Sequence, residues 1–401
     1  MKRIGLIREG KIPQDSRVAL TPKQCKWLQE QNTDLKCIVQ PSAARCFTDN
    51  EYVKAGIELS EDLSDCDIIL GIKEIPINML IAGKKYFFFS HTKKKQPSNQ
   101  KLLQEIIKQK ITLVDYECLE HEDGQRVLGF GFFAGIVGAH NGIWAYGKRT
   151  GKFNLPRVYE CKDYRSLINY YFGLKLPNIK IAVTGSGRVA HGIIEIMNLI
   201  GVTEVEKDEY LESTFSYPVY VQLKSGDLYE HKESGEYSRM DFHLHPQNYI
   251  CKFENYISET DILMNGVYWD KGIPALFTKE DVQKDTFRIK TISDVTDDTN
   301  GSIPINFGDQ DIFNPVYGVD KESFEKTAPY LQNSIDIIAI GNLPNELPRD
   351  ASRYFGEQLI KFIIEDIFDC KTLMLQSATI IKEGMLTNNF SYLRDYADGK
   401  L

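Results

Sequence analysis

The sequence predicts an α/β protein with two Rossmann-like domains, each built on a parallel sheet flanked by helices. Three observations support this fold class. Short apolar segments alternate with helix-like segments through the first 135 residues. A second alternation follows, and it contains a glycine-rich turn between an apolar strand and an apolar helix. Finally, 401 residues are enough for two domains that each bury a core.

The first domain is expected to contain five strands. Their predicted ranges are residues 3–7, 36–39, 67–72, 86–90 and 111–115. A helix should begin after Thr21, because threonine caps helices and Pro22 suits the first helical position. Apolar residues at helical spacing predict a second helix over residues 100–109. The C-terminal residues 350–401 are expected to be mostly helical.

The second α/β unit carries a dinucleotide fingerprint of the form Gly-x-Gly-x-x-Ala. A strand at residues 179–184 leads into the turn, and a helix at residues 193–200 follows it. The residues of the turn are Gly185, Ser186, Gly187, Arg188, Val189 and Ala190. The first glycine permits the tight turn, the second admits the pyrophosphate, and the small last residue lets helix and strand pack closely. The polar stretch 207–255 is long for a connection and is expected to be an insertion.

The choice between NAD and NADP depends on the residue that meets the adenine ribose. An acid at the end of the next strand would favour NAD, and Glu204, Glu206 and Asp208 are the candidates. A spacing of about 20 residues from the glycines favours Glu206. Arg188 and Lys207 could instead accept a 2′-phosphate, so NADP stays an alternative.

Polar groups follow several predicted strands of the first domain. Lys73 and His91 each come directly after an apolar run, and ligands of open α/β sheets bind beyond the carboxyl ends of strands. A lysine and a histidine can act as an acid–base pair when their pKa values move toward neutrality. Arg17 and Arg126 suit substrate carboxylates because guanidinium binds them bidentately. From position alone, a solvated lysine and a structural histidine are the alternative interpretations.

The composition excludes several classes of function. A net charge of −8 argues against nucleic-acid binding. The first residues lack the long apolar stretch of a signal peptide, and no apolar run is long enough to span a membrane. The eight cysteines form no Cys-x-x-Cys pair, so no metal site is indicated and a reduced, cytoplasmic protein is expected.

Several motifs, taken in order, show a resemblance to a known family. They lie at residues 15–22, 40–42, 52–56, 70–73, 89–92, 114–117, 265–269, 294–298, 342–344 and 347–348. In these segments the chain resembles saccharopine dehydrogenase, the lysine-forming enzyme, and especially the lysine–ketoglutarate reductase half of the bifunctional animal enzyme. The resemblance implies a two-domain enzyme related to alanine dehydrogenase, with a cleft between the domains.

The resemblance also implies how the chain is divided. Residues 1–135 and 330–401 would form the substrate domain, and residues 136–329 the dinucleotide-binding domain. The implied reaction is the reversible, NAD(P)-dependent reductive condensation of L-lysine with 2-oxoglutarate. An amino acid and a 2-oxo acid would be the partners, without nucleic acid or membrane, and the oligomeric state is left open. Another amino-acid dehydrogenase of the alanine or opine type, or a non-catalytic NAD(P)-binding regulator, are the alternatives.

The resemblance assigns roles to individual positions. Lys73 and His91 match the acid–base pair. The positions that match substrate-binding residues are Arg17, Lys94, Gln96, Arg126 and Phe130. Beyond the glycine-rich turn, the positions that match dinucleotide contacts are Glu206, Tyr268, Val295 and Leu343. One position departs from the pattern: Gly341 stands where the family usually has aspartate, so Asp297 or Glu117 would have to supply that carboxylate, or the charge balance and substrate differ.

Overall fold

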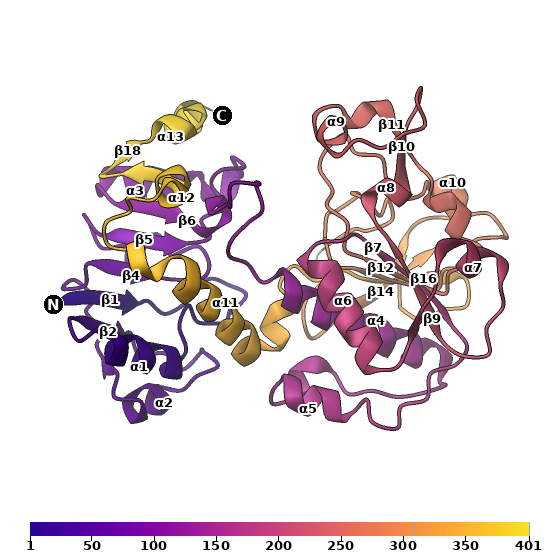
Figure 1. Cartoon of the computed structure of the whole chain (residues 1–401), viewed down its shortest axis with the longest axis horizontal. Helices are drawn as coiled ribbons and strands as arrows, with labels where there is room; N and C mark the ends of the chain where they lie inside the picture. The colour runs from indigo at the N-terminus through magenta and orange to yellow at the C-terminus, as the bar shows by residue number, and fades with distance from the viewer. Residues whose placement is uncertain (309, 401) are drawn as a thin grey trace. The chain divides into compact units, whose positions relative to one another are not determined.

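The computed structural model describes residues 1–308 and 310–400 and divides the chain into two compact units (Figure 1). Unit 1 comprises Met1–Phe130 and Pro348–Leu401, and unit 2 comprises Gly131–Leu347. Each unit is built on its own eight-stranded sheet with flanking helices. The predicted fold class, two Rossmann-like α/β domains, is confirmed.

The sheet of unit 1 has the order β18-β17-β6-β5-β4-β1-β2-β3. Its strands are β1 (Lys2–Leu6), β2 (Leu35–Val39), β3 (Glu58–Leu59), β4 (Ile68–Leu70), β5 (Lys85–Phe88), β6 (Thr112–Asp115), β17 (Thr379–Lys382) and β18 (Met385–Leu386). All five expected strands are found, as β1, β2, β4, β5 and β6. The strands β1 to β6 pair in parallel, whereas β17 and β18 add an antiparallel edge. The C-terminal region therefore contributes strands as well as the expected helices.

The two helices predicted for the first domain, after Thr21 and over residues 100–109, are present as α1 (Pro22–Gln31) and α3 (Gln100–Lys108). The other helices of unit 1 are α2 (Asp49–Lys54), α11 (Pro348–Phe362), α12 (Leu373–Ala378) and α13 (Arg394–Ala397). Thr21 caps α1: its hydroxyl accepts from the Gln24 N–H, and the Gln24 side chain accepts from the Thr21 N–H. This reciprocal pair satisfies two backbone donors that the helix leaves unbonded. In α3, Leu102, Leu103 and Ile106 are buried on one face.

The sheet of unit 2 has the order β15-β14-β16-β13-β12-β7-β9-β8. Its strands are β7 (Lys180–Thr184), β8 (Thr203–Glu204), β9 (Val219–Leu223), β12 (Ile262–Asn265), β13 (Thr291–Asp294), β14 (Val316–Asp320), β15 (Lys326–Thr327) and β16 (Ser334–Ile338). The six strands β8, β9, β7, β12, β13 and β16 pair in parallel. Strand β14 pairs antiparallel with both β16 and β15. Because β14 to β16 complete this sheet, the chain returns to unit 1 only at Pro348.

The stretch 207–255, expected as an insertion, is only partly one. It contains α7 (Lys207–Glu212), β9, α8 (Ser225–Leu228), β10 (Tyr229–His231), α9 (Arg239–Leu244) and β11 (Tyr249–Cys251). Strand β9 pairs with β7 inside the main sheet, whereas β10 and β11 form a separate two-stranded sheet. The polar composition of the stretch conceals a strand of the main sheet, because the five residues of β9 lie between polar segments.

The remaining helices of unit 2 include one very close pair. They are α4 (Gly131–Thr150), α5 (Tyr164–Asn169), α6 (Arg188–Leu199) and α10 (Lys279–Val282). Helices α4 and α6 meet backbone to backbone: a Cβ on Gly192 would lie 2.0 Å from the Phe132 carbonyl oxygen, and one on Gly135 would lie 2.0 Å from the Val189 oxygen. The start of α6, which follows the glycine-rich turn, is thereby fixed against α4. None of the helices in the described part of the chain is both long and apolar enough to cross a bilayer.

The contact between α4 and α6 gives a stability prediction. Gly192→Ala should lower the free energy of unfolding by about 1–3 kcal/mol, because the methyl group meets backbone atoms that cannot turn away. The gain of about 1 kcal/mol in helix propensity only partly offsets this clash. Denaturant unfolding measures the difference. Gly187→Ala is the control, since a Cβ there meets nothing within 4 Å, and equal loss in both variants would contradict the contact.

Candidate active site

The carboxyl ends of four adjacent strands of unit 1 carry acid–base groups. In the order β6-β5-β4-β1 they are followed by Glu117, His91, Lys73 and Glu9. From β1 the chain runs outward to β2 and β3, and then returns to form β4 on the other side of β1. The strands β1 and β4 therefore flank a topological switch point, which is where ligands of open α/β sheets bind.

Lys73 is held at this switch point through its backbone. The two carboxylate oxygens of Glu9 accept hydrogen bonds from the N–H groups of Ile72, at 2.7 Å, and Lys73, at 2.9 Å. Burial lowers the pKa of Lys73 to about 8, and the positive charge of Arg17 acts in the same direction. An amine with this pKa can both accept and donate a proton near neutral pH.

Two carboxyl groups near Lys73 differ in their protonation. Burial raises the pKa of Glu9 to about 8, and the charge of Asp15 adds to this rise. Burial would also raise the pKa of Asp15, but the charge and hydrogen bonds of Arg17 outweigh it and hold that pKa at about 2. Arg17 chelates Asp15 through Nε and Nη2, and both side chains are buried. Near neutral pH, Asp15 is therefore ionised, whereas Glu9 can hold a proton.

His91 adopts a backbone conformation that is uncommon for any residue but glycine. Its φ of 52° lies in the left-handed region, and such strain persists only where the surroundings enforce it. The Ser90 N–H and hydroxyl both donate to Asp115, at 3.1 and 2.5 Å. The Phe89 ring stacks on the imidazole, with centroids 6.2 Å apart. The loop after β5 is therefore fixed to β6, and it presents the His91 ring in one orientation.

Glu74 sets the tautomer of His91. The imidazole Nδ1–H donates to Glu74 Oε1 at 2.8 Å, while Lys11 Nζ contacts Oε2 at 2.7 Å. Burial alone would raise the pKa of Glu74, but the hydrogen bonds from His91 and Lys11 hold it at about 2. The carboxylate stays ionised, and it leaves the Nε2 atom of His91 available for proton transfer.

The predicted substrate-binding residues fall into separate groups. Arg17 lies over the Phe130 ring, with 4.2 Å between the guanidinium carbon and the ring centroid. Phe130 stacks in turn on Phe355 of α11, at 4.7 Å between centroids. Because Arg17 is buried and already chelates Asp15, its charge acts mainly on its neighbours.

A second group gathers around Glu117. Arg126 Nη2 lies 2.7 Å from Glu117 Oε1, and Lys94 Nζ lies 3.9 Å from the same oxygen. Both cations remain partly exposed, whereas the Glu117 carboxylate is buried. Gln96 does not join either group: its side chain accepts from Asn99 and its carbonyl accepts from Tyr396.

Glu9 and Glu74 were not recognised in the sequence as site residues. Two signals could have found them. Glu74 is the direct neighbour of Lys73, and Glu9 stands three residues after β1 as Lys73 stands three residues after β4. Since β1 and β4 pair in register, with Leu6 opposite Leu70, these two positions come together. The sequence alone does not reveal that β1 and β4 are neighbours in the sheet.

In unit 2, the glycine-rich turn has the geometry that a dinucleotide requires. Gly185 has φ 98°, and a Cβ there would lie 2.6 Å from the Gly266 carbonyl oxygen. Gly187 precedes α6, and nothing lies within 4 Å of the position of its Cβ. Ser186 and Gly187 are exposed, while Ala190 is buried. The turn thus leaves open space at the N-terminus of a long helix, which suits a pyrophosphate.

Three of the predicted dinucleotide contacts follow other strands of the same sheet. Tyr268 follows β12, Val295 follows β13 and Leu343 follows β16. These strands run parallel to β7, so their carboxyl ends lie at the edge where the glycine-rich turn begins. Tyr268 is exposed, whereas Val295 and Leu343 are buried.

Glu206 lies elsewhere in the sheet. It follows β8, and β9 separates β8 from β7. The end of β9 contacts the turn directly: Gly185 N–H donates to the Leu223 carbonyl at 2.8 Å, and Gln222 Nε2 donates to the Gly185 carbonyl at 3.0 Å. The first residue after β9 is Lys224, whose side chain is exposed. A lysine, rather than an acid, therefore follows the strand next to β7.

Gly341 lies beside an aspartate of the neighbouring loop. A Cβ at position 341 would come within 2.9 Å of Asp297 Oδ2. Asp297 has φ 55°, so its backbone also adopts the left-handed conformation. A carboxylate is thus present next to Gly341, although it is supplied by a residue that follows β13 rather than β16.

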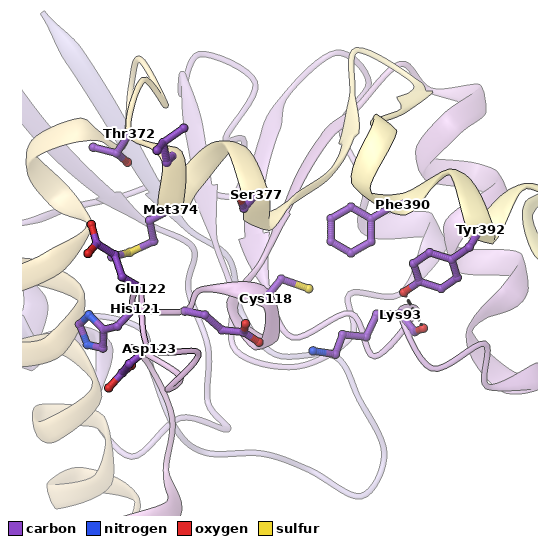
Figure 2. Close-up of a pocket in the computed structure, with 12 residues that line it drawn as sticks. Lys93, Cys118, His121, Glu122, Asp123, Thr372, Met374, Ser377, Phe390 and Tyr392 are labelled. Carbon is purple, nitrogen blue, oxygen red and sulfur yellow. Dashed lines mark hydrogen bonds between the residues drawn. The ribbon is translucent and has the colours of Figure 1, made fainter. Parts of the chain in front are cut away.

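Unit 1 also has a large pocket at a different place (Figure 2). It has a volume of about 1060 Å³, and neither Lys73 nor His91 lines it. Figure 2 shows Phe390 and Tyr392 on one side and His121 on the other. Cys118 also lines the pocket, and burial raises the pKa of its thiol, which makes the thiolate scarce. Lys73 and His91 lie at the strand ends, outside this pocket.

Comparison with known proteins identifies homologues of the chain. Residues 5–137 match the family model for the N-terminal domain of alanine dehydrogenase/PNT. The chain is 30% identical to alpha-aminoadipic semialdehyde synthase of Bos taurus, over 99% of this chain and 48% of that protein. It is 26% identical to saccharopine dehydrogenase [NAD(+), L-lysine-forming] of Yarrowia lipolytica, over 90% of this chain and 91% of that protein. The chain spans about half the length of the synthases it matches.

A solved structure shows the same fold. An L-alanine dehydrogenase superposes with a TM-score of 0.67 at 16% identity, and all of both chains is covered. The resemblance drawn from the sequence motifs is confirmed, because the homologues are saccharopine dehydrogenase and the synthase, and the fold is that of alanine dehydrogenase. The homologues named as dehydrogenases are oxidoreductases that act on amino acids, and they support a nicotinamide cofactor.

The lowered pKa of Lys73 can be measured without any substrate. We expect acylation of Lys73, followed against pH by peptide mass spectrometry, to have its midpoint near pH 8. Arg17→Met should move that midpoint to higher pH, because it removes a positive charge that disfavours the ammonium form. Arg126→Met is the matched control, since Arg126 pairs with Glu117 and should leave the midpoint in place. An unchanged midpoint in the Arg17 variant would refute the electrostatic coupling.

Proposed function

We propose that the chain is an NAD(P)-dependent oxidoreductase that condenses L-lysine reductively with 2-oxoglutarate, or cleaves the product in reverse. The observation that carries the proposal is Lys73, an amine with a pKa of about 8 whose backbone is fixed at the switch point of unit 1. It follows β4, and His91 follows the neighbouring strand β5. The similarity to saccharopine dehydrogenase supports the choice of substrates.

The two proton carriers suit the two stages of such a reaction. Neutral Lys73 takes a proton from the ε-ammonium group of the substrate lysine, and the free amine then attacks the keto carbon. The added nitrogen passes one of its protons to the oxygen and forms the carbinolamine. Lys73 then returns its proton to the hydroxyl group, which leaves as water and gives the protonated imine. The glycine-rich turn from Gly185 to Ala190 would hold a nicotinamide cofactor, whose chemistry would be the supply of a hydride to the imine carbon. His91 then donates a proton to the nitrogen through Nε2, while Glu74 holds Nδ1.

The cations of unit 1 divide between binding and tuning. Arg126 and Lys94 are partly exposed and close together at Glu117, so we assign a substrate carboxylate to them. Arg17 is buried against Asp15 and instead lowers the pKa of Lys73. Phe130 keeps the guanidinium in place from one side.

We assign to Asp297 the carboxylate that the family resemblance leads us to expect at position 341. Its Oδ2 lies within 2.9 Å of the point where the Cβ of residue 341 would stand. A side chain there and Asp297 would compete for the same volume. Glu117, the other residue considered from the sequence, already binds Arg126. The negative charge next to Gly341 is thus retained by a different residue of the same edge.

The assignment is tested by Lys73→Met in an assay of cofactor oxidation with lysine and 2-oxoglutarate. Turnover should fall by a factor on the order of 10² or more, because the variant loses its proton carrier but keeps the apolar part of the side chain. Lys23→Met, at an exposed position of α1, is the control and should keep full activity. Unchanged turnover of the Lys73 variant would refute its role.

The same assay separates the alternatives. Turnover with pyruvate and ammonia, but not with lysine and 2-oxoglutarate, would identify an alanine-type dehydrogenase. Tight binding of NAD(P)H without turnover of any amine and keto acid would identify a non-catalytic regulator. Either result would overturn the proposed reaction. The pKa of Lys73 is tested separately, by the acylation experiment above.

We further propose that the chain prefers NADP to NAD. The strand next to β7 is β9, and its end contacts Gly185, so Lys224 is the residue positioned to meet a 2′-phosphate. Lys207 is less suited, because it is paired with Asp227. Glu206, which favours NAD on spacing, follows the outer strand β8. A cation at the end of the neighbouring strand accommodates a 2′-phosphate, as arginine does in other Rossmann folds.

Lys224→Glu should reverse this preference. The ratio of kcat/KM for NADPH over that for NADH should fall by about tenfold or more, which corresponds to about 1.4 kcal/mol. Steady-state kinetics with both cofactors measures the ratio. Glu206→Gln is the matched control and should leave the ratio nearly constant. If Glu206→Gln changes the ratio and Lys224→Glu does not, the adenine ribose is recognised from β8 and the proposal fails.

A further inference from the structure

Unit 2 has a cavity of about 480 Å³ at the amino ends of its parallel strands. It is lined by residues that precede β13, by Lys321 directly after the antiparallel strand β14, and by Ser334 at the start of β16. The glycine-rich turn, in contrast, follows the carboxyl end of β7. Because β7, β12, β13 and β16 are parallel, the cavity and the turn are at opposite ends of the strands. The cavity therefore does not belong to the dinucleotide site.

Two arginines at this cavity are neutralised by buried acids. Arg149, at the end of α4, contacts Asp336 at 2.8 Å and also donates to the carbonyls of Leu331 and Ser334. Arg288 binds Asp261 through Nε and Nη2, both at 3.0 Å. These pairs form part of the walls and are satisfied within the protein.

Two lysines of the cavity lack such partners. Lys290 is exposed, and Lys321 is half-buried with its Nζ donating to the Phe287 carbonyl at 3.1 Å. Among the described residues, neither ammonium group has a carboxylate within ion-pair distance. Burial lowers the pKa of Lys321, and the charges of Arg149 and Lys290 add to this effect. Of the described residues that line the cavity, Asp285 alone is an acid, so the lining is positive although the protein's net charge is −8.

We propose that this cavity is a second binding site of unit 2, which takes a small anion with clustered oxygens, of the phosphate or dicarboxylate type. Lys290 and Lys321 supply the charge. Ser258, Thr286 and Gln332 line the same space and can donate hydrogen bonds to the anion oxygens. The volume is in the range of metabolite sites. An anion there would relieve the mutual repulsion that disfavours the charged form of Lys321.

The site is tested by isothermal titration of the full chain with inorganic phosphate in one arm and succinate in the other, at constant ionic strength. We expect saturable binding in at least one arm. It should weaken by about tenfold or more in the double variant Lys290→Met/Lys321→Met, since each lost charge removes a charge-assisted hydrogen bond. Lys175→Met, an exposed lysine elsewhere in unit 2, should bind as the unchanged protein does. The anion that binds more tightly, phosphate or succinate, identifies the class of ligand.

Thermal unfolding separates loss of binding from loss of folding. Without added anion, the double variant should be at least as stable as the unchanged protein, because it removes a half-buried charge that its neighbours repel. The variant Lys290→Arg/Lys321→Arg should keep the binding. Phosphate affinity that survives in the methionine variant would assign the anion to the glycine-rich turn and overturn the proposal, as would the lack of saturable binding in both arms.

Discussion

The hydrogen bonds that Glu9 accepts from Ile72 and Lys73 connect loops that lie more than sixty residues apart in the chain. They exist because β4 pairs with β1 after the chain has crossed over β2 and β3. Without this carboxyl group, two backbone N–H groups at the end of a parallel strand would need another acceptor. With it, the backbone of Lys73 is fixed, and the neighbouring Glu74 binds His91, which follows β5. Most of the geometry of the candidate site follows from this one crossing.

Much of unit 1 could be predicted because its signals are local. A run of buried residues followed by a polar side chain makes Lys73 and His91 candidates, and a threonine followed by proline predicts the start of α1. Glu9 and Glu74 escaped prediction because their importance depends on which strands are neighbours. A glutamate after a strand is usually solvated, and only the pairing of β1 with β4 brings Glu9 to Lys73. Sequence spacing contains no record of that pairing.

Unit 2 shows the same limit in a different form. The glycine-rich turn is recognised from six consecutive residues, and the structure gives each of its glycines a steric reason or open space. The residue that meets the ribose is harder to predict, because β8 comes next in the chain but β9 comes next in the sheet. Glu206 and Lys224 carry opposite charges, so the order of two strands changes the expected cofactor. The strand β8 has only two residues, whereas β9, which takes the inner place, has five.

The shifted pKa values of Lys73 and Glu9 lower the free energy of unfolding of the protein. In the unfolded chain Lys73 would titrate near 10.5, so between about 8 and 10.5 the unfolded state binds more protons and stability rises with pH. Glu9 would titrate near 4.5 when unfolded and near 8 when folded, so the folded state binds more protons in that interval and stability falls as pH rises. The two contributions are both unfavourable near pH 8. Selection for stability alone would not favour two such penalties, whereas the proton transfer that we propose for Lys73 requires a pKa near neutrality.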